Sequence, residues 1–296
     1  MYMRRRLGAA VVVVAVLALI VHLLNTSDAH GRPSHRTAKT AERGATKRPA
    51  AKRPQSHIDP FTTQAMGSYM ATRQGEITAA VENLNTGATY LYHPRDTTQT
   101  ASIVKVDILE TLLHNEQGDG PLDDDDATLA TGMIENSNND DATALWNEDN
   151  GSTGIAAYNA LAGLKDTVPN DDGLWGETMT TAADQLVLLR RLVFPNPLLS
   201  TASRDYQLGL MSQVEADQQW GVSGGVPSTA RIALKNGWVP LTSNTDWEVN
   251  SIGRIAGDGR RYLLAVLTAH DSSEAYGIAT IEGISAIVWK DLGQTV

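Results

Sequence analysis

The alternation of apolar and polar positions becomes regular only after about residue 57. Residues 59–73 (DPFTTQAMGSYMATR) carry apolar side chains at helical spacing and predict an amphipathic helix. Residues 75–94 alternate with a period of two, and Asn85, Thr86 and Gly87 in their middle are typical of a hairpin turn. The globular part is therefore predicted to begin with a helix followed by a two-stranded hairpin.

A helical pattern then dominates as far as about residue 215, and strand-like alternation returns after residue 230. Helices are predicted over residues 101–114, 121–133, 138–147, 152–163 and 182–193. Three strands follow, two of them joined by a turn at residues 257–259, and residues 272–292 predict a final helix. This order predicts an α/β (α+β) fold, in which an antiparallel five-stranded sheet is flanked by N- and C-terminal helices and carries an inserted all-helical lobe at about residues 101–215.

The amino terminus differs from the globular part in its composition. Residues 7–24 (LGAAVVVVAVLALIVHLL) form an apolar run directly after three consecutive arginines. This arrangement predicts a transmembrane anchor or a signal sequence, with residues 1–6 as a cytoplasmic basic tail. Residues 25–56 lack apolar periodicity and predict a disordered basic linker. In both versions residues 57–296 lie outside the cytoplasm, either anchored by a single span or secreted after cleavage.

Charge and composition exclude several function classes. Residues 1–56 carry 11 Lys and Arg against 2 Asp and Glu, which leaves 13 against 32 in the remainder. So acidic a globular part argues against a nucleic-acid partner. The chain has no cysteine, which excludes disulfides and thiol catalysis. The acidic run at residues 123–126 fits the first turn of a helix, whose dipole favours carboxylates, so we expect no metal and no cofactor. We expect a monomer.

The stretch ASIVKVDIL at residues 101–109 places a single lysine among aliphatic side chains. On a helix, Ser102 and Lys105 share a face because they are three residues apart. A desolvated amine has a lowered pKa and can take the proton of a serine hydroxyl, whose developing negative charge is favoured at a helix start. The alternative is a lysine that extends toward solvent beside an N-cap serine.

Two further short motifs follow in the chain. In MIENSNNDDATALW, Ser137 and Asn139 fall at a predicted helix start, where either residue could simply be an N-cap. In RIALKNGWV, Lys235 lies near the end of an alternating strand and Gly237 permits close approach of another backbone. The alternative for this lysine is a solvated side chain on an edge strand.

Taken in order, Ser-x-x-Lys, Ser-x-Asn and Lys-x-Gly resemble the motif set of the class A serine β-lactamases and the related penicillin-binding proteins. The resemblance covers about residues 57–292, and Thr180 and Thr181 resemble the pair that opens a helix after the omega loop of that family. It implies the same fold and a serine hydrolase that attacks a β-lactam or a related amide through an acyl-enzyme.

The resemblance also implies a role for each matched residue. Ser102 is the nucleophile and Lys105 the base that activates it. Ser137 passes a proton to the leaving nitrogen, helped by Lys235, whose positive charge keeps the Lys105 amine neutral. Asn139 orients Lys105 and the substrate amide. The oxyanion hole is formed by the backbone N–H groups of Ser102 and Trp238.

Three departures from the family pattern bear on substrate and turnover. Asn236 stands where the family has a Thr or Ser whose hydroxyl holds the substrate carboxylate, and the second motif reads Ser-Asn-Asn. The short loop at residues 164–181 lacks the Glu-x-x-x-Asn pattern of the deacylating glutamate, so Glu177 and Asp172 are the candidates that remain for a deacylating acid. Arg231 and Arg254 are candidates for binding a substrate carboxylate or are ordinary surface arginines.

Three functions therefore stay open. The first is hydrolysis of a β-lactam or related small amide, with doubtful deacylation. The second is a penicillin-binding or sensor module without turnover, and the third is a peptidase of D-amino-acid cell-wall peptides.

Overall fold

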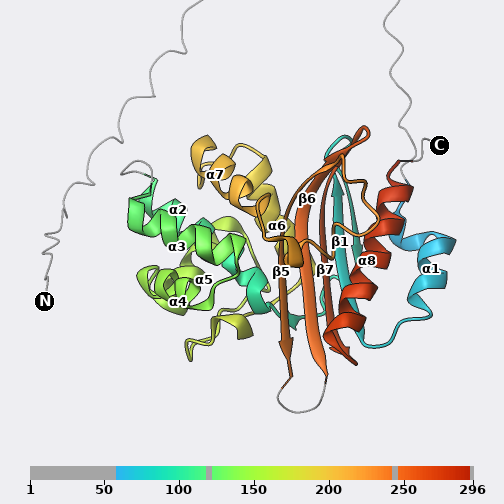
Figure 1. Ribbon diagram of the computed structural model, residues 1–296, viewed down its shortest axis with the longest axis horizontal. Coiled ribbons are helices and arrows are strands. Elements are labelled where there is room, and N and C mark those ends of the chain that lie inside the picture. The colour runs from blue at the N-terminus through green and yellow to red at the C-terminus, as the bar shows by residue number, and fades with distance from the viewer. Residues whose placement is uncertain (1–57, 118–121, 242–245, 294–296) are drawn as a thin grey trace, which may run out of the picture. The chain divides into compact units, whose positions relative to one another are not determined.

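A computed structural model describes residues 58–117, 122–241 and 246–293 (Figure 1). The basic tail predicted at residues 1–6, the anchor or signal predicted at 7–24 and the linker predicted at 25–56 lie outside the described residues. Within the described ranges, every helix is too short or too polar to cross a bilayer.

The centre of the structure is an antiparallel five-stranded sheet with the strand order β2-β1-β7-β6-β5. The predicted hairpin is present, because β1 pairs with β2 from Ala79 opposite Tyr92 to Asn83 opposite Ala88. The C-terminal hairpins complete the sheet and leave β5 at one edge. The strands are β1 (Glu76–Asn83), β2 (Ala88–Tyr92), β5 (Arg231–Pro240), β6 (Trp247–Gly257) and β7 (Arg260–Asp271).

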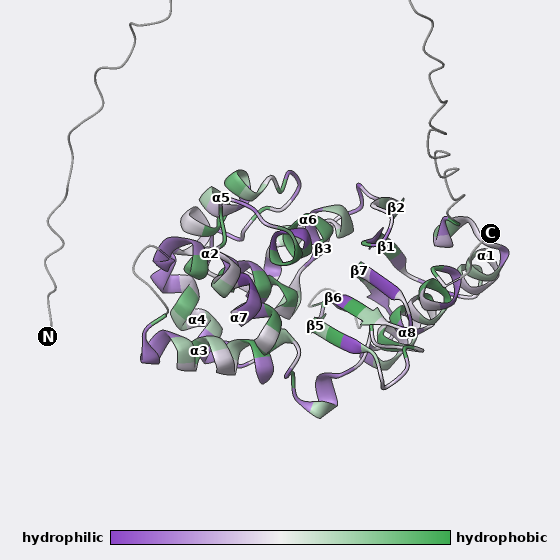
Figure 2. Ribbon diagram, turned by 90° about the horizontal axis from the view of Figure 1, so that it is seen from above, coloured by the Kyte–Doolittle hydropathy of each residue, from purple (hydrophilic) through white to green (hydrophobic). Residues whose placement is uncertain are grey.

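Both faces of this sheet are covered, as the view from above shows (Figure 2). Helices α1 (Gln64–Met70) and α8 (Glu274–Asp291) cover one face, and the helices between β2 and β5 lie on the other. In β1, Ala80 belongs to the core on the helical-lobe side, whereas Ala79 and Val81 belong to the core under α8. A strand buried on both sides has a continuous apolar sequence, which explains LLAVL in β7.

The helical lobe is built from six α-helices, of which α2 runs through its centre. Ten consecutive residues of α2, Val104–Leu113, are buried. The predicted bounds of α6 agree with the structure, and α7 was not predicted as a separate helix. The lobe helices are α2 (Val104–Glu116), α3 (Asp124–Glu135), α4 (Asn139–Glu148), α5 (Gly151–Ala162), α6 (Ala182–Val193) and α7 (Thr201–Met211).

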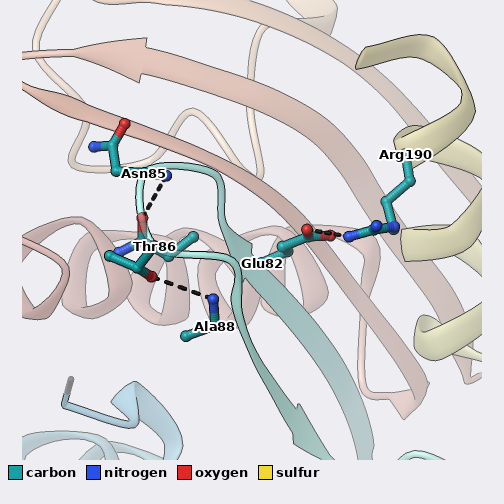
Figure 3. A network of polar contacts seen from close by, with 6 residues as sticks. Glu82, Asn85, Thr86, Ala88 and Arg190 are labelled. Atoms are coloured by element: carbon teal, nitrogen blue, oxygen red, sulfur yellow. Dashed lines mark hydrogen bonds and ion pairs between the residues drawn. The ribbon is translucent and has the colours of Figure 1, made fainter. Parts of the chain in front are cut away.

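An ion pair between a buried carboxylate and a half-exposed arginine joins the sheet to the helical lobe. Arg190 on α6 donates to the carboxylate of Glu82 on β1, beside the β1–β2 turn (Figure 3). The Glu82 side chain is only 2% exposed, whereas that of Arg190 is 46% exposed. Besides its backbone bonds, the turn has two local bonds to side chains, from Asn85 N to Asn83 Oδ1 and from Ala88 N to Thr86 Oγ1. The predicted turn therefore has a side-chain basis, since Asn and Thr oxygens satisfy its backbone donors.

Candidate active site

Ser102 lies in a short 3-10 turn, η2 (Ala101–Ile103), which leads into α2. The predicted single helix from residue 101 is thus a 3-10 turn followed by an α-helix. The preceding residue, Ala101, has a φ of 45°, a conformation that costs a non-glycine residue about 1–2 kcal/mol. Neighbouring bonds hold this strained backbone, because Thr100 N donates to Thr178 O and Asn250 Nδ2 donates to Thr100 O. Contacts from the sheet and from the loop after α5 therefore fix the serine just before the N-terminus of α2.

Lys105 is fully buried one turn further along. Its Nζ lies 3.1 Å from Ser102 Oγ, 2.7 Å from Ser137 O and 2.8 Å from Asn139 Oδ1. The two carbonyl oxygens accept only, so they take the two hydrogens of a neutral amine. The amine lone pair is then available to the Ser102 hydroxyl. An amine can be buried here because its nitrogen has hydrogen-bond partners.

The protonation state of this amine follows from its surroundings. Burial lowers the pKa of Lys105 to about 7, and the smaller effect of the Asp141 carboxylate opposes that change. The Trp175 ring, whose centroid lies 4.9 Å from Lys105 Nζ, covers the amine. A large fraction of the amine is consequently neutral near pH 7, which is the form that can accept a proton.

Ser137 and Asn139 reach Lys105 because neither of them caps the helix that follows. The N-cap of α4 is Asn138, whose Oδ1 accepts from the backbone N–H groups of Asp140 and Asp141. Ser137 has a φ of 55°, the left-handed conformation that lets the chain turn immediately before the cap. The alternative of simple N-capping by Ser137 or Asn139 therefore does not apply, and both side chains are free to contact the amine.

Lys235 approaches the same serine from the sheet. Its Nζ lies 3.0 Å from Ser137 Oγ, and Lys105 Nζ lies 3.1 Å from that oxygen. Burial lowers the pKa of Lys235 well below its usual range, and the charge of Lys105 lowers it further. Burial lowers the pKa of both amines, and the role of a charged Lys235 in keeping Lys105 neutral stays a prediction. Ser137 Oγ thus connects two amines and can pass a proton between them.

Gly237 allows β5 to pass directly over the turn that contains Ser102. A Cβ atom at this position would lie 2.6 Å from Ser102 N and 2.8 Å from Ile103 N. Only a residue without a side chain permits this approach. It brings the backbone of Trp238 beside the start of α2, and both Ser102 and Trp238 line the same cavity. Two N–H groups from two separate elements are the usual construction of an oxyanion hole.

Asn236 is placed away from the site. Its side chain is buried, and its Nδ2 donates to Gln218 O and Trp220 O in the loop that precedes β5. The expectation that Asn236 contacts the substrate is therefore not met by its side chain, which braces this loop. Successive side chains of a strand point to opposite faces, and here Lys235 is the one directed to Ser137.

A cavity of about 380 Å³ opens in front of Ser102. Trp175 and Leu174 form one side of it, and Trp238 and Val239 form the other. Trp175 comes from a 3-10 turn, η3 (Trp175–Glu177), and its Nε1 donates to Thr143 Oγ1 on α4. Trp175 belongs to none of the three sequence motifs. The sole signal is an aromatic residue in a short loop.

The two candidate acids for deacylation lie in this loop but not beside Lys105. Glu177 lines the cavity and is exposed, and its carboxylate is 3.5 Å from Asn170 Nδ2. Asp172 is exposed and does not line the cavity; its backbone N–H donates to Asn170 Oδ1. Among the described residues, the space against the Lys105 amine is occupied by the indole of Trp175.

The serine, the two lysines and the asparagine therefore meet at one place, where the sheet joins the helical lobe. The profile of the "Beta-lactamase enzyme family" matches residues 125–292, more than half of the chain, and the protein belongs to that family. Ser102 and Lys105 precede the matched residues, so their assignment depends on the geometry described above.

Curated relatives and solved structures agree with the family. The "Putative lipoprotein LppW" of Mycobacterium tuberculosis is 27% identical over 189 residues, which are 62% of this chain and 59% of the relative. A β-lactamase from Chitinophaga pinensis superposes with a TM-score of 0.68 at 19% identity, over 76% of this chain and 96% of the other. A class A β-lactamase from Mycobacterium abscessus gives 0.67 at 20% identity, over 77% and 98%. PBP-A gives 0.66 at 19%, over 77% and 96%. At these identities the structures establish the fold.

Proposed function

We propose that the protein is an extracytoplasmic serine hydrolase of the class A β-lactamase type that forms an acyl-enzyme on Ser102. The observation that carries the proposal is the distance of 3.1 Å between Lys105 Nζ and Ser102 Oγ, together with the pKa of about 7 that burial gives the amine. A positioned base with a pKa near the working pH is the requirement for activating a serine hydroxyl.

The acylation step follows from the contacts. Ser102 Oγ attacks the carbonyl carbon of a β-lactam or related amide while its proton moves to the Lys105 amine. The N–H groups of Ser102 and Trp238 stabilise the oxyanion, a type of contact worth about 3 kcal/mol per donor. The C–N bond then breaks, and the leaving nitrogen takes a proton from Ser137 Oγ. That oxygen is re-protonated from Lys105, with Lys235 as its second neighbour.

We propose further that acylation is faster than deacylation. Hydrolysis of the acyl-enzyme needs a water molecule activated beside the ester. Trp175 fills the space against Lys105, and Glu177, which also lines the cavity, is exposed to solvent. This favours a second candidate function, a penicillin-binding sensor that remains acylated. A PBP-A variant of the same fold, with a TM-score of 0.68, was solved as an acyl-enzyme complex with penicillin G.

Intact-mass spectrometry of the full-length chain after exposure to benzylpenicillin tests both steps. We expect a mass increase equal to the added penicillin, its absence in Ser102→Ala, and decay over a much longer time than its formation. Rapid turnover of a chromogenic cephalosporin would contradict the slow deacylation and leave the acylation proposal standing. Failure of any reactive acyl donor to label Ser102 would defeat the enzyme assignment. Release of product from D-amino-acid wall peptides would favour the peptidase instead.

The location is proposed from the sequence. The apolar run at residues 7–24 after a basic start supports export, with single-pass anchoring or cleavage and secretion as the two versions. The name of the relative LppW, a putative lipoprotein, supports a place outside the cytoplasm. We propose that the protein is a monomer and that its partners are β-lactams or wall peptides and, through residues 7–24, a membrane. Protease accessibility of the globular part in intact cells tests the export.

A further inference from the structure

The cavity in front of Ser102 contains very little charge. Of the described side chains that line it, the single charged one is Glu177, which is negative. A carboxylate near that residue would be repelled, and it would find no cation in the wall. The chemistry of the wall therefore disfavours an anionic ligand.

Neither of the two amines of the site lines this cavity. Lys105 and Lys235 are both fully buried, and each amine already contacts Ser137 Oγ. Arg231 and Arg254, the candidates from the sequence for a carboxylate partner, line a different cavity of about 650 Å³ between α7 and the start of β5. Arg231 is four residues before Lys235, which is about 13 Å along a strand.

Position 236, which is expected from the resemblance to hold a substrate carboxylate, also differs from the family. Both hydrogens of the Asn236 amide are used on Gln218 O and Trp220 O. Opposite Asn236 on β6 stands Ser251, which is fully buried and accepts from the backbone N–H of Val222. Neither strand therefore offers an available cation or hydroxyl to an anion at this point.

Aromatic and aliphatic side chains form much of the cavity wall, beside the uncharged polar residues Gln99, Asn139 and Thr143. Leu174 is 53% exposed at the rim although it is a large aliphatic residue. Trp175 and Trp238 face the cavity from the loop and from β5, and Trp238 is braced edge-on by Trp220 at 5.7 Å between ring centroids. A volume of about 380 Å³ is within the usual range for small-molecule sites, roughly 300–1,000 Å³. A flat apolar group suits such walls.

We infer that this site takes uncharged acyl donors with an aromatic or bulky apolar acyl group, and that a free carboxylate on the donor does not assist binding. The inference rests on the proposed acylation of Ser102 and names the substrate class of that reaction. It departs from the carboxylate recognition that the resemblance in the third motif implies.

Benzylpenicillin and its methyl ester test this inference, because they share the phenylacetyl group and the reactive amide and differ in one charge. The full-length chain is exposed to each compound, and Ser102 acylation is followed by intact mass. Each rate is divided by the rate at which the compound reacts with hydroxide. We expect the normalised rate of the ester to equal or exceed that of the acid. A faster acid overturns the inference and leaves the proposed function intact, whereas no acylation by either compound overturns both.

A matched pair of variants tests the role of charge in the wall. Leu174→Lys places a cation at the rim, and Leu161→Lys makes the same change at a leucine that is 59% exposed on α5, which contributes no residue to the cavity. We expect Leu174→Lys to raise the acid-to-ester ratio by about threefold or more, and Leu161→Lys to leave it unchanged. An unchanged ratio in Leu174→Lys, or the same change in both variants, overturns the inference.

Discussion

Replacing Gly237 by alanine is expected to abolish most acylation while leaving the chain folded. The added methyl group would lie 2.6 Å from Ser102 N and 2.8 Å from Thr100 O, whereas ordinary Cβ contacts begin at about 3.4 Å. The strand and the nucleophile turn must therefore separate by about 0.8 Å. Both contacted atoms belong to backbone, so no flexible side chain can move aside.

This separation has two measurable consequences. It moves the N–H of Trp238 away from that of Ser102, and losing one oxyanion donor lowers a rate by about 10²–10³-fold. Overpacking of this kind costs ~1–3 kcal/mol of folding free energy. In a chain of this size each kcal/mol lowers the Tm by about 2–4 °C.

Acylation of Ser102 by benzylpenicillin, followed by intact mass, and the Tm from thermal unfolding are the two measurements. Gly209→Ala on α7 is the matched control, because a Cβ there meets nothing within 4 Å. Alanine is favoured over glycine in a helix by about 1 kcal/mol, so the control should be slightly stabilised and fully active. A Gly237→Ala protein that is acylated at the rate of the unmodified chain would refute the close approach of β5 to Ser102.

Three further predictions concern titration and burial. The acylation rate should fall about tenfold per pH unit below pH 7 and level off above it, because the base is the neutral Lys105 amine with a pKa of about 7. Acylation rates measured between pH 5 and 9 test this. A flat profile would exclude Lys105 as the base. Arg190→Met should lower stability by ~1–3 kcal/mol in denaturant titrations, because it leaves the buried Glu82 carboxylate without its partner. Adding Glu82→Gln should restore part of that loss, and a neutral single variant would contradict the pairing. Asp149→Asn should stabilise the fold more at pH 8 than at pH 5. Burial raises the pKa of Asp149 to about 8, so between about pH 4 and 8 the carboxyl is protonated in the folded state and ionised in the unfolded state. The carboxyl therefore lowers the stability of the fold progressively as the pH rises through this range. Equal Tm differences between variant and unmodified chain at pH 5 and pH 8 would count against this.

The sequence by itself determined the features that depend on neighbours along the chain. The β1–β2 hairpin follows from alternation and from the turn residues around Asn85, and α6 has the predicted bounds because its apolar period is unbroken from Ala182 to Val193. The meeting of Ser102 with Lys105 was predictable for the same reason, since three residues bring two side chains onto one face of a helix.

Contacts between distant segments were decided by the tertiary structure. Ser137 and Lys235 are 98 positions apart, and they meet because β5 and the start of α4 pack around α2. The burial that lowers the pKa of Lys105 has the same origin, since the amine is enclosed by α4 and by Trp175 from the loop after α5. Sequence periodicity carries no information about which distant element covers a given face.

Asn236 illustrates the same limit within a motif. The Lys-x-Gly pattern indicated a site strand, yet the direction of the Asn236 amide depends on carbonyl groups of a loop 16 and 18 positions earlier. The amide donates to both of these carbonyl groups, and Asn236 does not line the cavity in front of Ser102. Local patterning thus determined the elements and the serine–lysine pair. Non-local packing determined the charge of the amines and the apolar character of the cavity, because both depend on which distant groups exclude water.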